Sequence, residues 1–232
     1  MDHRGRGVAL IWIVATAALW AAAPIGAAEL SGQISIASSG QALRSSETTE
    51  AVVYFRPTAA FAPPAALPTT QMATRRKEFV PRVLAITPGT EVRFPNLDPI
   101  LHNAFSGSPG NIFDTGVYGN GEGSSHVFES AGLVKVYCNV HHSMNATILV
   151  LDTPWFTRPD AQGRFRLQDL PEGPGDLVVY HDRTSPWQQR IEVGATAAEP
   201  LQIHLELTRR KVPPHMNKFG KPYGRRNDAG SY

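Results

Sequence analysis

The stretch VYCNVHHSMN, residues 136–145, brings one thiol, two imidazoles and one thioether into a short loop. Cys138 is the only cysteine of the chain and ends an alternating apolar–polar run, and another such run begins just after Met144. A turn between two strands makes the side chains of Cys138, His141 and Met144 converge. They are a strong soft ligand, a borderline ligand and a weak soft ligand, which together favour copper.

A trigonal copper site takes two imidazoles and one thiolate, with a distant axial methionine, so a second histidine must come from elsewhere. His102, in FPNLDPILHNAFSG, lies 36 residues before Cys138 and follows an expected strand. The amide of Asn103 can hydrogen-bond across to the Cys138 loop and hold the two ligand loops together. His142 is an alternative ligand to His141, whereas His126, His181 and His204 lack matching partners and are expected in surface or hydrogen-bonded roles.

The N-terminus predicts a secretory signal peptide over residues 1–28. Arg4 and Arg6 precede an apolar run from Val8 to Ala23, and small residues follow up to Ala28. The run is shorter than the roughly 20 residues that a membrane-spanning helix needs. We therefore expect a cleaved, periplasmic protein, with an uncleaved membrane anchor as the alternative. Its compartment is oxidising, and cysteines there usually pair. A single cysteine cannot pair within its chain, so it is inert, bridged to a partner or chemically used.

Short alternating segments separated by glycine and proline predict an all-β protein. The segment PTAAFAPPAALPTT, residues 57–70, cannot continue a sheet and predicts a domain boundary. The segment TRPDAQGRFRLQDLPEGPGDLVVYHD, residues 157–182, resembles part of a carboxypeptidase-regulatory or transthyretin-like sandwich, whose first strands resemble residues 30–55. This resemblance implies a signal peptide (1–28), N-terminal strands of a second sandwich (29–56), a linker (57–70), a copper-type sandwich (71–152), the rest of the second sandwich (153–207) and a basic tail (208–232). The alternative is that the N-terminal strands extend the middle domain.

Charge is unevenly distributed although the formal net charge of the chain is only +2. Residues 208–232 hold seven Lys or Arg and one acid, giving +6, whereas residues 29–207 hold 13 Lys or Arg and 18 acids, giving −5. The tail has little to bury and is expected to be disordered. It is either a solvated end or a segment that docks on an acidic partner or an anionic lipid surface. Nucleic acid is not expected as a partner.

The pattern His102-Asn103…Cys138-x-x-His141-x-x-Met144, after EFVPRVLAITPGTEVRFPN, resembles the cupredoxins, the blue-copper family. The short ligand loop is most similar to the amicyanin branch. The wider order of motifs, ending in DTPWFT and TRPDAQGRFRLQDLPEGPGDLVVYHD, resembles plastocyanin-like proteins labelled methylamine utilization proteins. His142 departs from the pattern, since an acidic or non-ligating residue is expected there.

The resemblance implies a cupredoxin Greek-key β-sandwich plus a second, smaller sandwich of the carboxypeptidase-regulatory or transthyretin-like type. It also implies one type 1 copper ion, one-electron transfer without catalysis, and a redox partner such as cytochrome c or an amine dehydrogenase. Copper storage or delivery with the same ligands, and a non-redox β-sandwich interaction module, are the alternatives. A cysteine–histidine nucleophile is disfavoured, because a thioether has no purpose in such a site.

Overall fold

The computed structural model describes residues 28–38, 41–42, 45–194, 199–208 and 215–222. The predicted signal peptide therefore lies outside the described residues, except for Ala28, which begins the first strand. The predicted all-β class is confirmed. One four-residue helix, α1 (Ser45–Thr48), accompanies the strands. In the part of the chain that is described, no helix is long and apolar enough to span a membrane.

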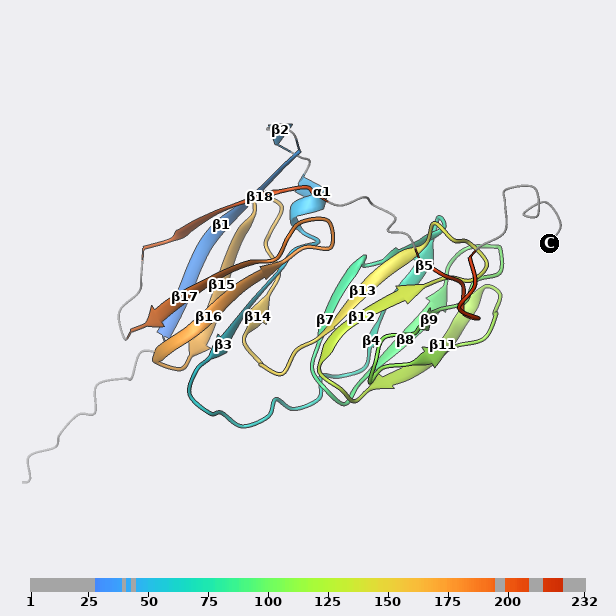
Figure 1. The fold of residues 1–232 in the computed structure, drawn as a ribbon, viewed down its shortest axis with the longest axis horizontal. Coiled ribbons are helices and arrows are strands. Elements are labelled where there is room, and N and C mark those ends of the chain that lie inside the picture. Colours follow the sequence, from blue (N-terminus) through green and yellow to red (C-terminus); the bar gives the residue numbers. More distant parts are fainter. Residues whose placement is uncertain (1–27, 39–40, 43–44, 195–198, 209–214, 223–232) are drawn as a thin grey trace, which may run out of the picture.

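The strands form four sheets, paired as two sandwiches that lie side by side (Figure 1). The host sandwich is built from both ends of the chain: β1 (Ala28–Ser38), β2 (Gln41–Ala42), β3 (Val52–Pro57), β14 (Phe156–Thr157), β15 (Arg164–Leu170), β16 (Gly173–Tyr180), β17 (Trp187–Val193) and β18 (Leu201–Glu206). One sheet has the order β15-β1-β18, with β2 paired to β1, and the other has the order β14-β3-β16-β17.

The inserted sandwich is formed by the middle of the chain: β4 (Thr70–Gln71), β5 (Ala73–Arg75), β6 (Glu78–Val80), β7 (Val83–Ile86), β8 (Thr90–Asn96), β9 (Phe105–Ser106), β10 (Phe113–Asp114), β11 (Gly121–Phe128), β12 (Gly132–Tyr137) and β13 (Asn145–Val150). Its sheets have the orders β10-β9-β12-β13-β7 and β11-β8-β5-β6, with β4 paired to β8. Strand β3 extends through Pro57 and β4 starts at Thr70, so the connection is one residue shorter at each end than the predicted linker.

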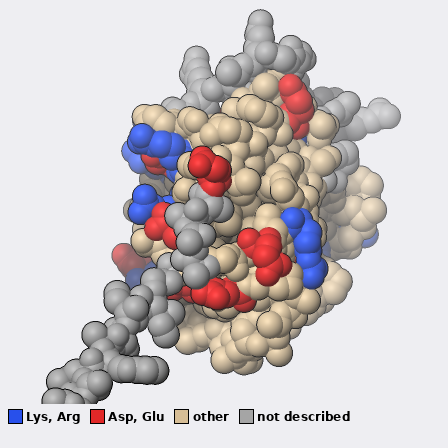
Figure 2. All heavy atoms as spheres, turned by 90° about the vertical axis from the view of Figure 1, so that its left-hand side faces the viewer, with Lys and Arg blue, Asp and Glu red and all other residues tan. Residues whose placement is uncertain are grey.

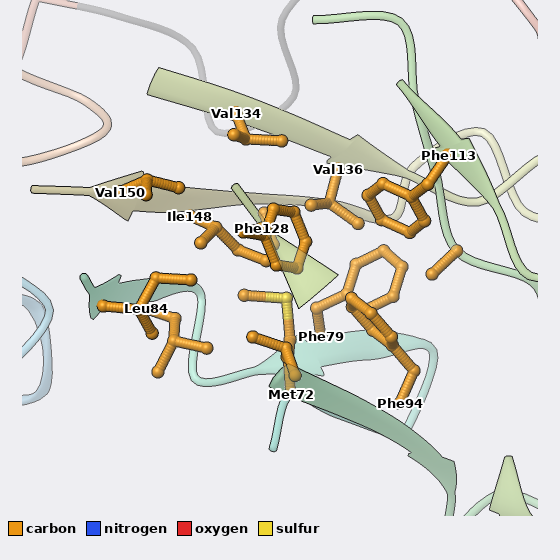
Figure 3. Close-up of a cluster of buried hydrophobic side chains, with 14 of the residues drawn as sticks. Met72, Phe79, Leu84, Phe94, Phe113, Phe128, Val134, Val136, Ile148 and Val150 are labelled. Carbon is orange, nitrogen blue, oxygen red and sulfur yellow. The ribbon is translucent and has the colours of Figure 1, made fainter. Parts of the chain in front are cut away.

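Each sandwich has its own apolar core. The core of the inserted sandwich includes Met72, Phe94, Phe128 and Ile148 (Figure 3). Strand β12 alternates as its sequence predicts, because Val134 and Val136 point into this core. The core of the host sandwich is a separate cluster.

A third apolar cluster joins the two sandwiches. Strand β13 is buried on both faces, since Ile148 enters the inserted core while Leu149 packs on Val52 and Tyr180 of the host sandwich. Arg158 of the host sandwich hydrogen-bonds the carbonyl of Val83 at the start of β7. The outer face of one inserted sheet is therefore covered by the host sandwich.

The expectations for the charged surface and the basic C-terminal segment come from composition alone. Acidic and basic side chains are interspersed on the described part of the face at the host-sandwich end (Figure 2). Within the predicted disordered tail, residues 215–222 depart from the expectation. They form a turn that packs on the inserted sandwich, because individual side chains there find specific partners. Residues 209–214 and 223–232 lie outside the described residues.

Candidate metal centre

His102 is held in the inserted sandwich by its backbone. It follows β8 and forms an isolated β-bridge with Tyr118, in which the amide of each residue donates to the carbonyl of the other at 3.0 and 2.8 Å. The side chain of His102 is 0% exposed. The backbone therefore fixes where this imidazole lies, and burial keeps its ring nitrogens away from bulk water.

The loop between β12 and β13 is a closed turn. The amide of Met144 donates to the carbonyl of His141 at 2.9 Å, and the amide of Cys138 donates to the carbonyl of Met144 at 3.3 Å. Because the two strands are paired up to Tyr137 and Asn145, only seven residues separate them, and the chain must turn back at once. This geometry brings the side chains of the loop to one end of the sandwich.

Three donor atoms meet at this end. The ligand atoms of His102, Cys138 and His141 all lie within 4.8 Å of one another. The Nδ1 of His102 is 3.9 Å from the sulfur of Cys138 and 3.2 Å from the Nδ1 of His141. Metal bonds of about 2.0–2.3 Å in a trigonal plane separate the donors by about 3.5–3.8 Å, so this triangle has the size of a metal site.

Met144 and His142 differ in their surroundings. Met144 is buried in the same apolar core cluster as Cys138. His142 is exposed and is not part of the three-donor cluster, whereas His141 is only partly exposed. Of the two histidines in the loop, the structure thus brings His141 to His102 and Cys138.

Asp98 fixes the tautomer of His102. Its carboxylate Oδ2 lies 2.9 Å from the Nε2 of His102. A proton on Nε2 leaves a lone pair on Nδ1, the nitrogen that faces Cys138 and His141. The carboxylate also accepts the backbone N–H groups of Arg76 and Lys77 at 2.6 and 2.9 Å. Burial raises the pKa of Asp98, but these N–H donors and His102 outweigh it and lower the pKa overall.

The turn at Arg76 and Lys77 is shaped for this contact. Both residues have positive φ, 54° and 58°, and they connect the paired residues Arg75 and Glu78 of a β-hairpin. Two successive residues in this left-handed region define the tight hairpin turn that suits twisted strands. The turn directs two consecutive amides at Asp98, so the hairpin β5–β6 supports His102 through one carboxylate.

His141 is set up as a neutral imidazole. Burial lowers its pKa, and the neighbouring His102 and Lys77 lower it further, against the opposing effect of Asp98. A neutral ring keeps a lone pair for a metal ion at neutral pH. The thiol of Cys138 is fully buried, so it is shielded from oxidants and from large substrates.

Asn103 connects the two ligand loops. Its side-chain oxygen accepts the amide of Asn139, the residue after Cys138, at 2.6 Å, and its nitrogen donates to Asp114 at 3.1 Å. The residues that follow His102 and Cys138 are therefore tied directly to each other. This bond limits how far the two strong donors can separate.

The remaining histidines have other surroundings. The ring of His126 stacks on Phe113 at 4.7 Å, and burial lowers its pKa. His181 is buried among charged residues between the sandwiches, and His204 contacts Ser35 on the host sandwich. Asp98 was not predicted from the sequence, although a carboxylate four residues before a candidate ligand histidine was a usable signal.

Comparison with known proteins gives cupredoxins at low identity. No family model and no curated protein sequence matches the chain. A purple cupredoxin from Nitrosopumilus maritimus aligns at 28% identity over 35% of this chain and 99% of its own, with a TM-score of 0.32. A reduced amicyanin variant aligns at 17% identity over 35% and 80%, with a TM-score of 0.33.

A copper-containing nitrite reductase from Thermus scotoductus aligns at 28% identity over 42% of this chain and 26% of its own, with a TM-score of 0.35. All three TM-scores are low. The assignment of a metal therefore depends on the side chains of this chain rather than on these structures.

Proposed function

We propose that this chain is a mononuclear type 1 copper protein that carries single electrons and catalyses no reaction itself. The observation that carries this is the triangle of the buried His102 and Cys138 and the partly exposed His141, whose donor atoms lie within 4.8 Å of one another. Two imidazoles and one thiolate are the equatorial ligands of such a site, and Met144 is the candidate axial ligand.

The ligand set separates copper from other uses of the same residues. A structural zinc site favours further thiolates or imidazoles, and a thioether is not among the usual zinc ligands. A nucleophilic cysteine must reach a substrate, whereas Cys138 is fully buried. The donor set is therefore suited to a copper ion enclosed in protein.

Copper, when bound, supplies reversible one-electron chemistry. The chain contributes the rest: Asp98 orients His102, Asn103 holds the two ligand loops together, and the core around Met144 excludes water. Electron transfer is fast when the ligands move little, and these contacts oppose movement of His102 and of the loop that carries Cys138. His141 is the partly exposed member of the triangle, so its ring edge is the proposed electron route.

The proposed setting is the periplasm, after removal of residues 1–28. The proposed partner is a redox protein such as cytochrome c or an amine dehydrogenase, on the basis of the motifs shared with proteins labelled methylamine utilization proteins. Electron-transfer contacts are usually small and weak. A transient complex at the His141 end of the inserted sandwich is therefore expected.

The test is the visible spectrum of the mature protein loaded with Cu(II). We expect an intense thiolate-to-copper band that is absent in Cys138→Ser and His141→Ala and is retained in His142→Ala, the adjacent control. Reversible bleaching by a reductant supports electron transfer, and slow or irreversible loss of copper on reduction supports storage or delivery instead. Copper binding without the band in the wild type would contradict the type 1 assignment.

A further inference from the structure

The C-terminal segment returns to the candidate copper loops. The last host strand, β18, ends at Glu206, and the described residues 215–222 lie beside the inserted sandwich instead (Figure 1, dark red). The ring of His215 stacks on the ring of Tyr137 with centroids 4.1 Å apart and planes 10° apart. Tyr137 directly precedes Cys138, so the segment packs against the strand that supplies the thiol.

The segment has a defined conformation of its own. The side-chain oxygen of Asn217 accepts the amides of Phe219 and Lys221 at 3.0 and 3.1 Å. The backbone of Asn217 also bonds to Lys221 and Gly220, at 2.8 and 2.9 Å, and Gly220 has a φ of 69°. Four hydrogen bonds thus close a tight turn around Lys218, and the turn fixes the direction in which Lys218 leaves the backbone.

Lys218 completes a ring of hydrogen bonds around the ligand loops. Its amide donates to the side-chain oxygen of Asn139 at 3.1 Å, and its ammonium donates to Asp114 at 2.7 Å. Asp114 accepts from Asn103, and Asn103 accepts from the amide of Asn139. The four residues form a closed ring that includes the direct neighbours of His102 and Cys138.

The ring gives the charge of Lys218 a structural role. Asp114 accepts hydrogen bonds from Asn103 and from the amide of Gly116 as well as from Lys218, so its carboxylate accepts three hydrogen bonds. The side chains of Lys218 and Asp114 are 23% and 39% exposed. Such a pair contributes modestly to stability by charge alone. Here Asp114 also orients the side-chain amide of Asn103, whose oxygen accepts the backbone amide of Asn139 in the Cys138 loop.

We propose that Lys218 is a positioning residue for the copper site and that residues 215–222 form a clasp over the ligand loops. The proposal rests on the proposed function for the identity of the metal, but the ring itself is defined by the protein alone. The basic C-terminal segment then has a role within this chain. It holds Asn103 and Asn139 in place and so limits the separation of His102 from Cys138.

The primary test uses the copper-free protein and the exchange rate of the Asn139 amide measured by NMR. For Lys218→Ala we expect exchange about 3–10-fold faster than in the wild type, because the ring loses its charged member. Lys218→Arg keeps a cationic donor and is expected within about twofold of the wild type. Lys221→Ala removes the same charge from an exposed position of the same turn and is the matched control.

The second readout is the transfer of copper from the loaded protein to a chelator. We expect Lys218→Ala to release copper about 3–10-fold faster, somewhat less than the 10–100-fold typical of groups that contact a ligand directly. Equal effects of Lys218→Ala and Lys221→Ala would reduce the clasp to a general charge effect and overturn the proposal. Unchanged Asn139 exchange in Lys218→Ala would also overturn it. Failure of the wild type to form the copper band would contradict the proposed function and leave the exchange test intact.

Discussion

Two fully buried histidines in the described part of the chain, His102 and His181, have different partners on their ring nitrogens. One nitrogen of His102 faces Asp98, and the other faces the donors of Cys138 and His141. Both nitrogens of His181 are used within the protein: Nδ1 accepts the amide of Arg183 at 3.2 Å, and Nε2 lies 3.4 Å from Glu47. Burial alone therefore does not make a histidine a metal ligand. The ring also needs a nitrogen whose lone pair faces other ligand atoms, as in His102.

The charges around the two rings differ in the same way. Arg82 lies 3.4 Å from His181 and binds Asp182 through two hydrogen bonds, at 2.7 and 3.1 Å, and Glu47 through one at 2.8 Å. Arg82 directly precedes β7 of the inserted sandwich, while Asp182 and Glu47 belong to the host sandwich. The His181 region is thus a charged contact that joins the two sandwiches, whereas the His102 region has one carboxylate, Asp98, behind a ring that faces the donors of Cys138 and His141.

The largest expected difference between the two regions concerns copper. His102→Gln removes one of two imidazoles, so we expect loss of the thiolate-to-copper band and a fall in copper affinity beyond the roughly 10–100-fold typical of outer contacts. His181→Gln is expected to keep the band position and the affinity of the wild type. Absorption spectra and competition with a chelator measure both. A band that survives in His102→Gln would remove His102 from the ligand set.

The second prediction concerns stability. Arg82→Met leaves the carboxylates of Asp182 and Glu47 without their guanidinium, and we expect a loss of about 2–4 kcal/mol in the free energy of unfolding. This is below the full cost for a buried pair, because Arg82 and Glu47 are 15% and 20% exposed. Urea unfolding of the copper-free protein measures the loss.

The control for Arg82 is Arg93→Met, which breaks the exposed Arg93–Glu122 pair of the inserted sandwich. Its expected cost is about 0–0.5 kcal/mol, since such pairs are screened by water. Both variants are expected to keep the copper band. Equal losses for Arg82→Met and Arg93→Met would contradict a buried contact between the sandwiches.

The sequence predicted one of these regions better than the other. Cys138, His141 and His102 were brought together because their residue types define a ligand set and the strand ends limit where they can lie. The His181 contact was not predicted in detail, because Glu47 and Arg82 lie 35 residues apart and each resembles an ordinary solvated charge. Only the packing of β13 against the host sandwich brings them together.

The tail shows a different limit of sequence reasoning. Seven basic residues in residues 208–232 predict disorder, but the composition does not indicate the specific contacts that a few of these residues make. Lys218 donates a hydrogen bond to Asp114, 104 positions earlier in the chain, and the ring of His215 stacks on that of Tyr137. A composition averages over such residues, whereas a closed ring of hydrogen bonds depends on four particular side chains. Alternation, by contrast, recurs in several strands, such as β1, β12 and β18, and it predicted the all-β class for that reason.

The smallest expected effect is a difference in pH dependence. Burial lowers the pKa of His181, and Arg82 adds to this against Asp182 and Glu47. Arg183 also faces this ring and favours its neutral form. Below its unfolded pKa of about 6.5, the unfolded chain binds a proton that the native histidine does not. The unfolded state then holds more protons, so the stability of the native protein falls as the pH drops.

Glu47 acts in the same direction at lower pH. Burial raises its pKa, but hydrogen bonding and charge from Arg82, with smaller effects of Arg183 and His181, lower it overall. A carboxyl with a lowered pKa contributes stability that is lost as the pH falls through its folded value. The informative range for the urea midpoint of the copper-free protein is therefore about pH 7 to pH 5, where Glu47 stays mostly ionised because the ordinary pKa of glutamate is about 4.3.

His181→Gln cannot bind the proton, so its midpoint is expected to fall less over this range than that of the wild type. His141 and His126 also have lowered pKa values, but they are present in both proteins, and the difference between the two slopes isolates His181. Parallel slopes would mean that His181 is protonated equally in the native and unfolded states. The charged contact between the sandwiches would then accommodate an imidazolium, and the two buried histidines would differ in their partners but not in their protonation.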